Sequence, residues 1–175
     1  MVNSQLVPGQ YDVIITVSGD GLVHEIINGL LNRADWNKPV EVPDKGRLRF
    51  SDTVTLGAIP GGTGNGLIKS LLNRADENYG VMEAAFRIIK GNSVRVDLTE
   101  ITFEYEPAKK VYSFLSFAWS IVADIDINSE VIRCCGPSRF TVWGAWRVLF
   151  MRDYYGSLRY IGENSNASQV IKKRN

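Results

Sequence analysis

Two glycine-rich turns carry the residue types best suited to chemistry on a phosphate group. They are Ser18-Gly19-Asp20-Gly21 and Pro60-Gly61-Gly62-Thr63-Gly64-Asn65-Gly66. Each turn follows an apolar, β-branched run and leads into an amphipathic helical pattern, so both are expected at one end of neighbouring strands. Backbone N–H groups at such turns and at helix starts favour an anion. The pattern predicts a phosphate site. A carboxylate beside a phosphate is electrostatically unfavourable, so we expect Asp20 to have a chemical role there.

The turns match neither of the two best-known phosphate-binding motifs. The sequence contains no Gly-x-x-x-x-Gly-Lys-Ser/Thr, and neither turn has the dinucleotide-binding spacing with an acidic residue about 20 positions later. Two interpretations therefore stay open on spacing alone. The glycines can serve only tight turns and helix starts, or they can form a nucleotide site at the carboxyl ends of strands.

The elements that must position these turns alternate between strand and helix up to about residue 91. The pattern predicts buried strands at 12–17 and 54–59, each followed by a helix, at 21–33 and 64–73, and a further helix at 79–90. Leu22, Ile26, Ile27, Leu30 and Leu31 are expected on one face of the first helix. The polar stretch 35–52 is expected to be a loop or insertion. This alternation indicates an α/β fold with a parallel sheet.

The second half of the sequence has a different pattern. Strands are expected at 93–98 and 101–105, with 106–110 as a hairpin-like connection to the apolar run 111–123. A helix is expected at 138–151, a strand at 154–161, and an unstructured tail from residue 162 onward. We therefore predict a nucleotide-binding domain over 1–91, the start of an antiparallel β-sandwich with a helical insert over 92–162, and a disordered tail over 163–175.

Composition sets loose bounds on function. The chain has 175 residues, 45% of them hydrophobic, and a formal net charge of +1, which gives no field suited to nucleic acid. The two cysteines are adjacent, at 134 and 135, and His24 is the single histidine, so neither a disulfide framework nor a multi-histidine metal site is expected. No apolar run approaches the roughly 18 residues that span a bilayer. A cytoplasmic location fits these features.

The two turns together resemble the catalytic domain of the diacylglycerol and sphingosine kinase family. The resemblance rests on the stretch from Val17 to Glu25, which holds the Gly-Asp-Gly turn, and on the Pro-Gly-Gly-Thr-Gly-Asn turn. The segment 115–126, with Ser129-Glu130, Arg133, Gly136, 139–141 and 155–160, is similar to the sphingosine kinase branch. The resemblance extends from about residue 11 to 162, and it implies an NAD kinase-like or diacylglycerol kinase-like parallel sheet.

The resemblance implies an ATP-dependent lipid kinase with Asp20 as the base that accepts the proton of a lipid hydroxyl. Glu25 has two interpretations, as a residue lining the nucleotide site or as a partner of the helix dipole. Arg133 and Arg139 carry over as phosphate contacts, with ordinary surface charge as the alternative. The full set of residues expected at ATP is Ser18, Gly19, Gly21, Glu25, Gly61, Gly62, Thr63, Gly64, Asn65, Arg133 and Arg139.

The lipid contacts that carry over are Ser116, Asp126, Ile121 and Phe140. A carboxylate at Asp126 would distinguish a cationic sphingoid base from uncharged diacylglycerol, and Asp124, two residues away, is expected on the same side of a strand. The aromatic and aliphatic side chains from here to the predicted helix have two interpretations, core or an acyl-chain slot. They are Phe114, Phe117, Trp119, Ile121, Phe140, Trp143 and Trp146.

The sequence also departs from the family. The family's first strand, with an Asn-Pro and glycine turn, and its downstream acidic magnesium segment have no counterpart here, so we expect a fragment. ATP and Mg²⁺ are the expected cofactors, with the magnesium ligands in the absent segments. Expected partners are a sphingoid base, a peripheral membrane and a second copy of the chain in a homodimer. The alternatives are a diacylglycerol or ceramide kinase, or a catalytically silent binding module.

Overall fold

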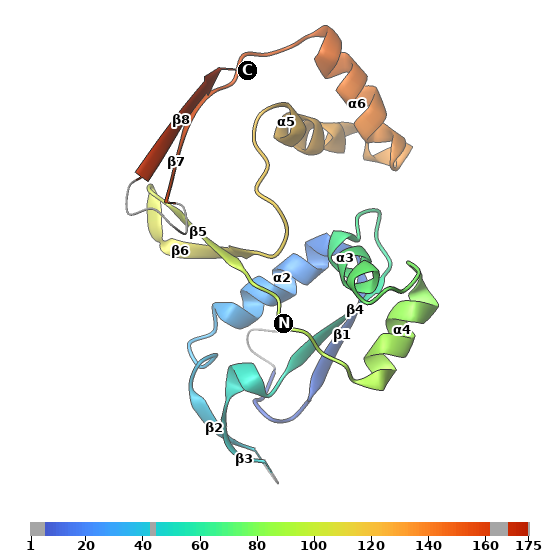
Figure 1. Ribbon diagram of the computed structural model, residues 1–175, viewed down its shortest axis with the longest axis vertical. Coiled ribbons are helices and arrows are strands. Elements are labelled where there is room, and N and C mark those ends of the chain that lie inside the picture. The colour runs from blue at the N-terminus through green and yellow to red at the C-terminus, as the bar shows by residue number, and fades with distance from the viewer. Residues whose placement is uncertain (1–5, 43–44, 162–167, 175) are drawn as a thin grey trace. The chain divides into compact units, whose positions relative to one another are not determined.

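The computed structural model describes residues 6–42, 45–161 and 168–174, which divide into two compact units, Met1–Ser116 and Phe117–Asn175 (Figure 1). The division falls 25 residues beyond the predicted boundary at residue 91. The first unit keeps the next two strands because they belong to a hairpin that contacts its first helix. Each unit is described separately below.

The first unit is built on a parallel pair of strands. Strand β1 (Val13–Ser18) pairs with β4 (Thr55–Pro60) in a register that runs from Val13 opposite Thr55 to Ser18 opposite Pro60. Both strands therefore end at the same edge, and the two glycine-rich turns leave the sheet side by side. The predicted α/β class and parallel pairing are confirmed.

Three helices pack around this pair (Figure 1). Helix α2 (Asp20–Leu31) packs on β1, and both α3 (Gly66–Arg74) and α4 (Val81–Lys90) pack on β4. The core side chains of these helices are Val23, Ile26, Ile27, Leu30, Leu72 and Ala84. Leu22 was predicted on the buried face of α2 but is exposed, because Val23 occupies the inward position instead.

Strand β1 is buried on one face only, which corrects the prediction of a fully buried strand. Thr16 is buried, whereas Val13, Ile15 and Val17 are 42%, 53% and 69% exposed. Alternate residues of a strand point to opposite faces. Because α4 packs on the neighbouring strand β4, the face of β1 that carries these three side chains stays open to solvent.

The predicted loop at 35–52 contains a hairpin. Strand β2 (Pro39–Val42) pairs antiparallel with β3 (Gly46–Arg49), and a 3-10 turn (Phe50–Asp52) follows. Phe50 is 1% exposed, with the Trp36 ring at 5.4 Å between centroids and the Arg33 guanidinium at 4.9 Å from its centroid. These contacts give a polar segment a small core of its own, which is why it folds back as a hairpin.

A second hairpin ends the first unit. Strand β5 (Thr99–Phe103) pairs antiparallel with β6 (Glu106–Ser113), with an irregularity between Thr102 and Phe103. The predicted connection at 106–110 is thus part of a strand, and residues 104–105 form the turn. The strand predicted at 93–98 is also wrong. Its residues are exposed and unpaired by any described strand, so their apolar alternation has no sheet to join.

The first helix of the second unit begins at Ile121, near the end of the apolar run 111–123. This unit contains α5 (Ile121–Asn128), a 3-10 segment (Ser129–Cys135) and α6 (Ser138–Leu149). Strand β7 (Tyr155–Ile161) then pairs antiparallel with β8 (Ser168–Arg174). The helix predicted at 138–151 and the strand at 154–161 are confirmed. The tail predicted as disordered contains β8, while residues 162–167 and 175 lie outside the described residues.

Candidate functional site

The two glycine-rich turns touch through their backbones. The Gly61 N–H donates to the Ser18 carbonyl oxygen at 3.1 Å, which extends the strand pairing by one residue, and the Asp20 N–H donates to the Gly64 carbonyl oxygen at 3.0 Å. A Cβ added to Gly62 would lie 2.4 Å from the Gly19 Cα. No side chain fits between the turns, so glycine at position 62 is required by the close approach itself.

Gly62 offers a sharp test of this contact. We expect Gly62→Ala to destabilise the protein by about 1–3 kcal/mol, because the new methyl group would meet backbone atoms rather than a side chain that can move. The matched control is Gly21→Ala, since a Cβ at Gly21 meets nothing within 4 Å and lies in α2. Alanine there should be neutral or stabilising by up to about 1 kcal/mol.

Thermal unfolding of the two variants measures the difference. Equal melting temperatures for Gly62→Ala and Gly21→Ala would contradict the close approach of the turns.

The second turn is held in shape by Asn65. The Asn65 Oδ1 accepts the Gly62 N–H at 3.1 Å, and its Nδ2 donates to the Gly62 carbonyl oxygen at 2.6 Å. The resemblance assigned Asn65 to ATP, yet here its amide is committed to the turn. Residues 61–64 are exposed around it, so the remaining backbone of the turn is open to a ligand.

Asp20 joins the two turns to helix α3. Its Oδ2 accepts the Gly66 N–H at 2.6 Å, and its Oδ1 accepts the Leu67 N–H at 3.1 Å. These donors are the first two residues of α3, whose unpaired N–H groups and dipole attract a negative charge. Asp20 is also the first residue of α2. A carboxylate has about four acceptor positions, so two remain for a further partner.

The other predicted residues of the first unit lie on or near these turns. The Ser18 and Thr16 hydroxyl oxygens lie 2.8 Å apart, and the Ser18 hydroxyl also donates to the Gly19 carbonyl oxygen at 3.2 Å. Thr63 is exposed on the second turn. Glu25 is exposed one helical turn into α2, beside a shallow hollow that His24, Asn28 and residues 109–111 also line. Ser116 is exposed at the end of the first unit.

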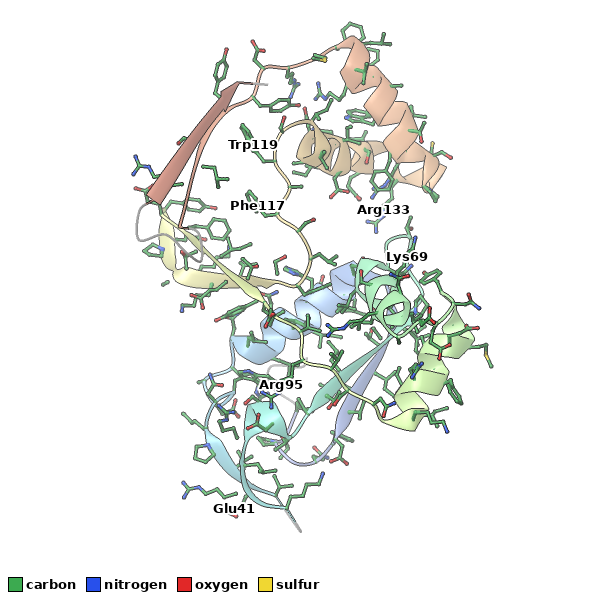
Figure 2. All side chains as sticks on the ribbon, in the orientation of Figure 1. Glu41, Lys69, Arg95, Phe117, Trp119 and Arg133 are labelled. Atoms are coloured by element: carbon green, nitrogen blue, oxygen red, sulfur yellow. The ribbon has the colours of Figure 1, made fainter. Side chains whose placement is uncertain are left out.

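The second unit holds the remaining predicted residues. Arg139 and Arg133 both pair with Glu130, the latter at 3.2 Å. The Arg139 guanidinium also lies 4.5 Å from the Phe140 ring centroid, whereas the Arg133 side chain is 80% exposed and projects from its unit (Figure 2). The Arg139 hydrogen bond lowers the pKa of Glu130, and both guanidinium charges add to the effect. From the sequence, Glu130 was named only as part of the resemblance and was given no role. Its spacing of three residues before Arg133 was the available signal.

Asp124 and Asp126 occupy different environments, which corrects the prediction that they share one side of a strand. Both lie on α5, where residues two apart point in nearly opposite directions. The Asp126 side chain is exposed, and within the described residues its carboxylate has no ion-pair partner. The Asp124 side chain is 9% exposed and pairs with Arg147, whose Nε lies 3.0 Å from Oδ2. Asp124 is therefore the structural residue of the pair.

The aromatic set predicted as core or acyl-chain slot is half-buried or exposed throughout. Phe117, Trp119 and Trp146 are 79%, 45% and 53% exposed, and Figure 2 shows the first two on the extended stretch before α5. The other four, Phe114, Ile121, Phe140 and Trp143, are half-buried. Burial therefore favours neither interpretation over the other.

Within the described ranges, the structure brings no three His, Cys, Asp or Glu side chains together as a metal site. No helix in the described part of the chain has the length and apolar character to cross a membrane.

Comparison with known proteins identifies the relatives of this chain. Residues 2–101 match the diacylglycerol kinase catalytic domain. The chain is 37% identical to sphingosine kinase 1 of Arabidopsis thaliana, over 87% of this chain and 28% of the relative. It is 30% identical to human sphingosine kinase 1, over 93% and 41%. It is also 37% identical to sphingoid long chain base kinase 4 of Schizosaccharomyces pombe, over 93% and 31%. The chain thus spans about a quarter to two fifths of the length of these relatives.

Proposed function

Because the chain belongs to the diacylglycerol kinase catalytic domain family, we propose that it is part of a lipid kinase that transfers the γ-phosphate of ATP to the primary hydroxyl of a sphingoid base. The observation that carries the proposal is the carboxylate of Asp20. It sits at the contact of two glycine turns, fixed by two backbone N–H groups at the start of α3. A rigid carboxylate beside an anion site is what phosphoryl transfer to an alcohol requires.

The reaction proceeds by in-line displacement. Asp20 accepts the proton of the lipid hydroxyl as its oxygen forms a bond to the γ-phosphorus. The bond between that phosphorus and the β,γ-bridging oxygen breaks, and ADP leaves with the electron pair. The protein's contribution is to position the two reactants and to stabilise the charge on the transferred group.

The two turns fit the phosphates of ATP. Residues 61–64 are exposed, and space around Gly21 is open, so the backbone is accessible to a phosphate at the start of α2. Arg133 and Arg139 both pair with Glu130, so either guanidinium would contact a phosphate by sharing or leaving that carboxylate, and Arg133 is the more exposed of the two. Ser18, Gly19, Gly62, Thr63 and Gly64 complete the proposed cradle, and Glu25 borders it on α2.

The sphingoid specificity rests on Asp126. An exposed carboxylate with no partner among the described residues can bind the ammonium group of a long-chain amino alcohol, which diacylglycerol lacks. The relatives from plant, human and fission yeast are named as kinases of sphingosine or of a sphingoid long chain base, which supports the proposal of such a substrate. Ser116, Ile121 and Phe140 are proposed to contact the same lipid.

The test is phosphoryl transfer from labelled ATP by the full chain in detergent micelles that contain sphingosine, a diacylglycerol or a ceramide. We expect sphingosine to be phosphorylated, with the product identified by mass. Phosphorylation of diacylglycerol or ceramide in its place would contradict the sphingoid assignment. Absence of transfer to all three lipids would contradict kinase activity for this polypeptide and favour a binding module.

Asp126 supplies the discriminating variant. Asp126→Asn should raise KM for sphingosine about 10- to 100-fold, because a hydrogen bond to a charged group contributes roughly 1.5–3 kcal/mol. The KM for ATP is the control, since ATP does not bind through the sphingoid ammonium group, and it should stay within about twofold of wild type. A KM for sphingosine that also stays within about twofold of wild type would show that charge recognition lies elsewhere.

A kinase with a lipid acceptor must meet the membrane that holds it. Trp146, Leu149, Phe150 and Met151 are 53–76% exposed at the carboxyl end of α6. Exposed aromatic and aliphatic side chains of this kind suit the interfacial region of a bilayer. We include peripheral membrane contact from the cytoplasmic side in the proposed function.

A further inference from the structure

The Asn28 side chain on helix α2 forms hydrogen bonds with the backbone near the end of β6, at the start of the segment that leads to Ser116. The Asn28 Oδ1 accepts the Tyr112 N–H at 2.7 Å, and the Asn28 Nδ2 donates to the Tyr112 carbonyl oxygen at 2.8 Å. The same Nδ2 donates to the His24 carbonyl oxygen at 2.9 Å within the helix. A single amide thus pairs with both backbone groups of one strand residue.

This pairing has the pattern of a β-ladder. Tyr112 lies opposite Glu100 of β5, and its N–H and C=O reach Asn28 on the other side of β6. Asn28 therefore supplies the donor and acceptor that a neighbouring strand would supply. If the amide is removed, two partly buried backbone groups lose their partners, at a cost of about 1–3 kcal/mol each.

The residues that follow Tyr112 return along α2 toward Asp20. The Phe114 ring centroid lies 6.5 Å from that of His24, one turn closer to the start of the helix. Leu115 reaches the start of α3. A methyl group added to Gly66 would lie 3.5 Å from the Leu115 Cδ1 and 3.3 Å from the Asp20 Oδ2. Leu115 and the Asp20 carboxylate thus flank the same glycine.

We infer that Asn28 is a positioning residue for the lipid acceptor. It fixes the segment 112–116 along α2, so that Ser116, directly after Leu115, is held near the carboxylate of Asp20. The inference rests on the proposed function, in which Ser116 contacts the lipid head group. Asn28 itself lies about two helical turns from Asp20 along α2.

The chain offers a matched control one turn further along the same helix. Asn32, the C-cap residue of α2, is exposed, and its Nδ2 donates to the Asn28 carbonyl oxygen at 3.0 Å. Its one contact with the strand is to the Lys110 carbonyl oxygen, at a longer 3.4 Å. Asn28→Leu and Asn32→Leu make the same chemical change on one helix, but only the first removes the strand-like pairing. Asn28→Asp keeps an acceptor for the Tyr112 N–H and removes the donor.

The experiment combines two measurements on the full chain. Hydrogen exchange of residues 112–116 should accelerate in Asn28→Leu and stay at the wild-type rate in Asn32→Leu. In the transfer assay, Asn28→Leu should raise KM for sphingosine about 10-fold or more, because a displacement of about 1 Å at a reacting group can cost up to about 100-fold. KM for ATP should stay within twofold. Asn28→Asp should lie between the wild type and Asn28→Leu, and it replaces the leucine variant if that one does not fold.

The two measurements can overturn the attachment of the segment and the positioning role of Asn28 separately. Unchanged exchange in the Asn28 variant overturns the attachment. Faster exchange with equal changes in KM for both substrates, or with no change in any kinetic constant, overturns the positioning role and leaves a structural one. Failure of the proposed function is recognised separately, because the wild-type chain would then phosphorylate no sphingoid base. In that case Ser116 would have no lipid to contact, and the positioning role of Asn28 would be overturned as well.

Discussion

Asp20→Asn is expected to lower kcat for lipid phosphorylation by about 10²- to 10⁴-fold, the contribution of a positioned general base. The asparagine amide keeps the size of the side chain and has no basic oxygen to take the proton of the lipid hydroxyl. Steady-state transfer of labelled phosphate from ATP to sphingosine measures the loss. KM for ATP should change little, because the backbone of the two turns stays in place.

A structural effect of the same substitution must be separated from the chemical one. The Asp20 oxygens accept the Gly66 and Leu67 N–H groups, and an asparagine would turn its NH₂ toward one of them. Loss of a helix-capping acceptor costs about 1 kcal/mol. The assay should therefore be run well below the melting temperature of the variant, where circular dichroism shows it fully folded. A kcat within about tenfold of wild type under those conditions would contradict a role as base.

Asp124→Asn is expected to destabilise the protein by about 3–5 kcal/mol, because it leaves the buried guanidinium of Arg147 without its counter-charge. The Asp124 carboxylate also accepts hydrogen bonds from the Tyr154 hydroxyl and the Asn128 amide. The Arg152 Nη1 lies 3.9 Å from the Asp124 Oδ2. One side chain thus joins α5, α6 and the start of β7. Denaturant unfolding measures the change in the free energy of unfolding.

Asp126→Asn is the control, since it makes the same substitution on the same helix at an exposed position. Its effect on the free energy of unfolding should stay within about 0.5 kcal/mol. Equal destabilisation by the two variants would contradict the buried network around Asp124.

The Asp124 network also predicts a dependence on pH. The Tyr154 hydrogen bond is the largest influence that lowers the pKa of Asp124 below its ordinary value of 3.8, and the charges of Arg147 and Arg152 lower it further. A carboxyl whose pKa is lower in the folded state stabilises the fold above the unfolded pKa and loses that contribution as pH falls through the folded pKa. The stability difference between wild type and Asp124→Asn should therefore shrink when pH is lowered from about 6 to about 3.

At alkaline pH, the same network makes the stability of the fold decrease as pH rises. The hydrogen bond to Asp124 raises the pKa of Tyr154. The stabilisation from its protonated hydroxyl is present below the ordinary tyrosine pKa and is lost as pH rises through the higher, folded value.

The strands and helices around the two turns could be predicted from the sequence because local signals agreed there. Each of the strands β1 and β4 is a short, mostly apolar run directly followed by a glycine, and each following helix has an apolar face of the correct period. The segment 111–123 gave no such agreement. It is mostly apolar with no clear period of two or 3.6, and such a run does not distinguish a strand from a helix. The structure ends β6 at Ser113 and begins α5 at Ile121.

The site could be located from the sequence, but its internal contacts could not. The glycine pattern places Asp20 at the correct edge of the sheet. Its carboxylate binds the start of α3, 46 residues away. This contact depends on how α3 packs, and no local sequence pattern predicts that packing. Asn28 is a similar case, because its partner Tyr112 is 84 residues distant. Asp124 and Asp126 could be separated only once their segment was known to be helical.

The contact between Gly19 and Gly62 has a consequence for recombination between relatives. A Cβ on either residue would lie within 2.7 Å of a backbone atom of the opposite turn. The two turns must therefore come from the same relative, although 42 residues lie between Gly19 and Gly62 in the chain. A chimaera that takes the first turn from one relative and the second from another joins two backbones that were never fitted to each other. Crossover points for such chimaeras therefore belong before β1 and after α3, and not in the β2–β3 hairpin between them.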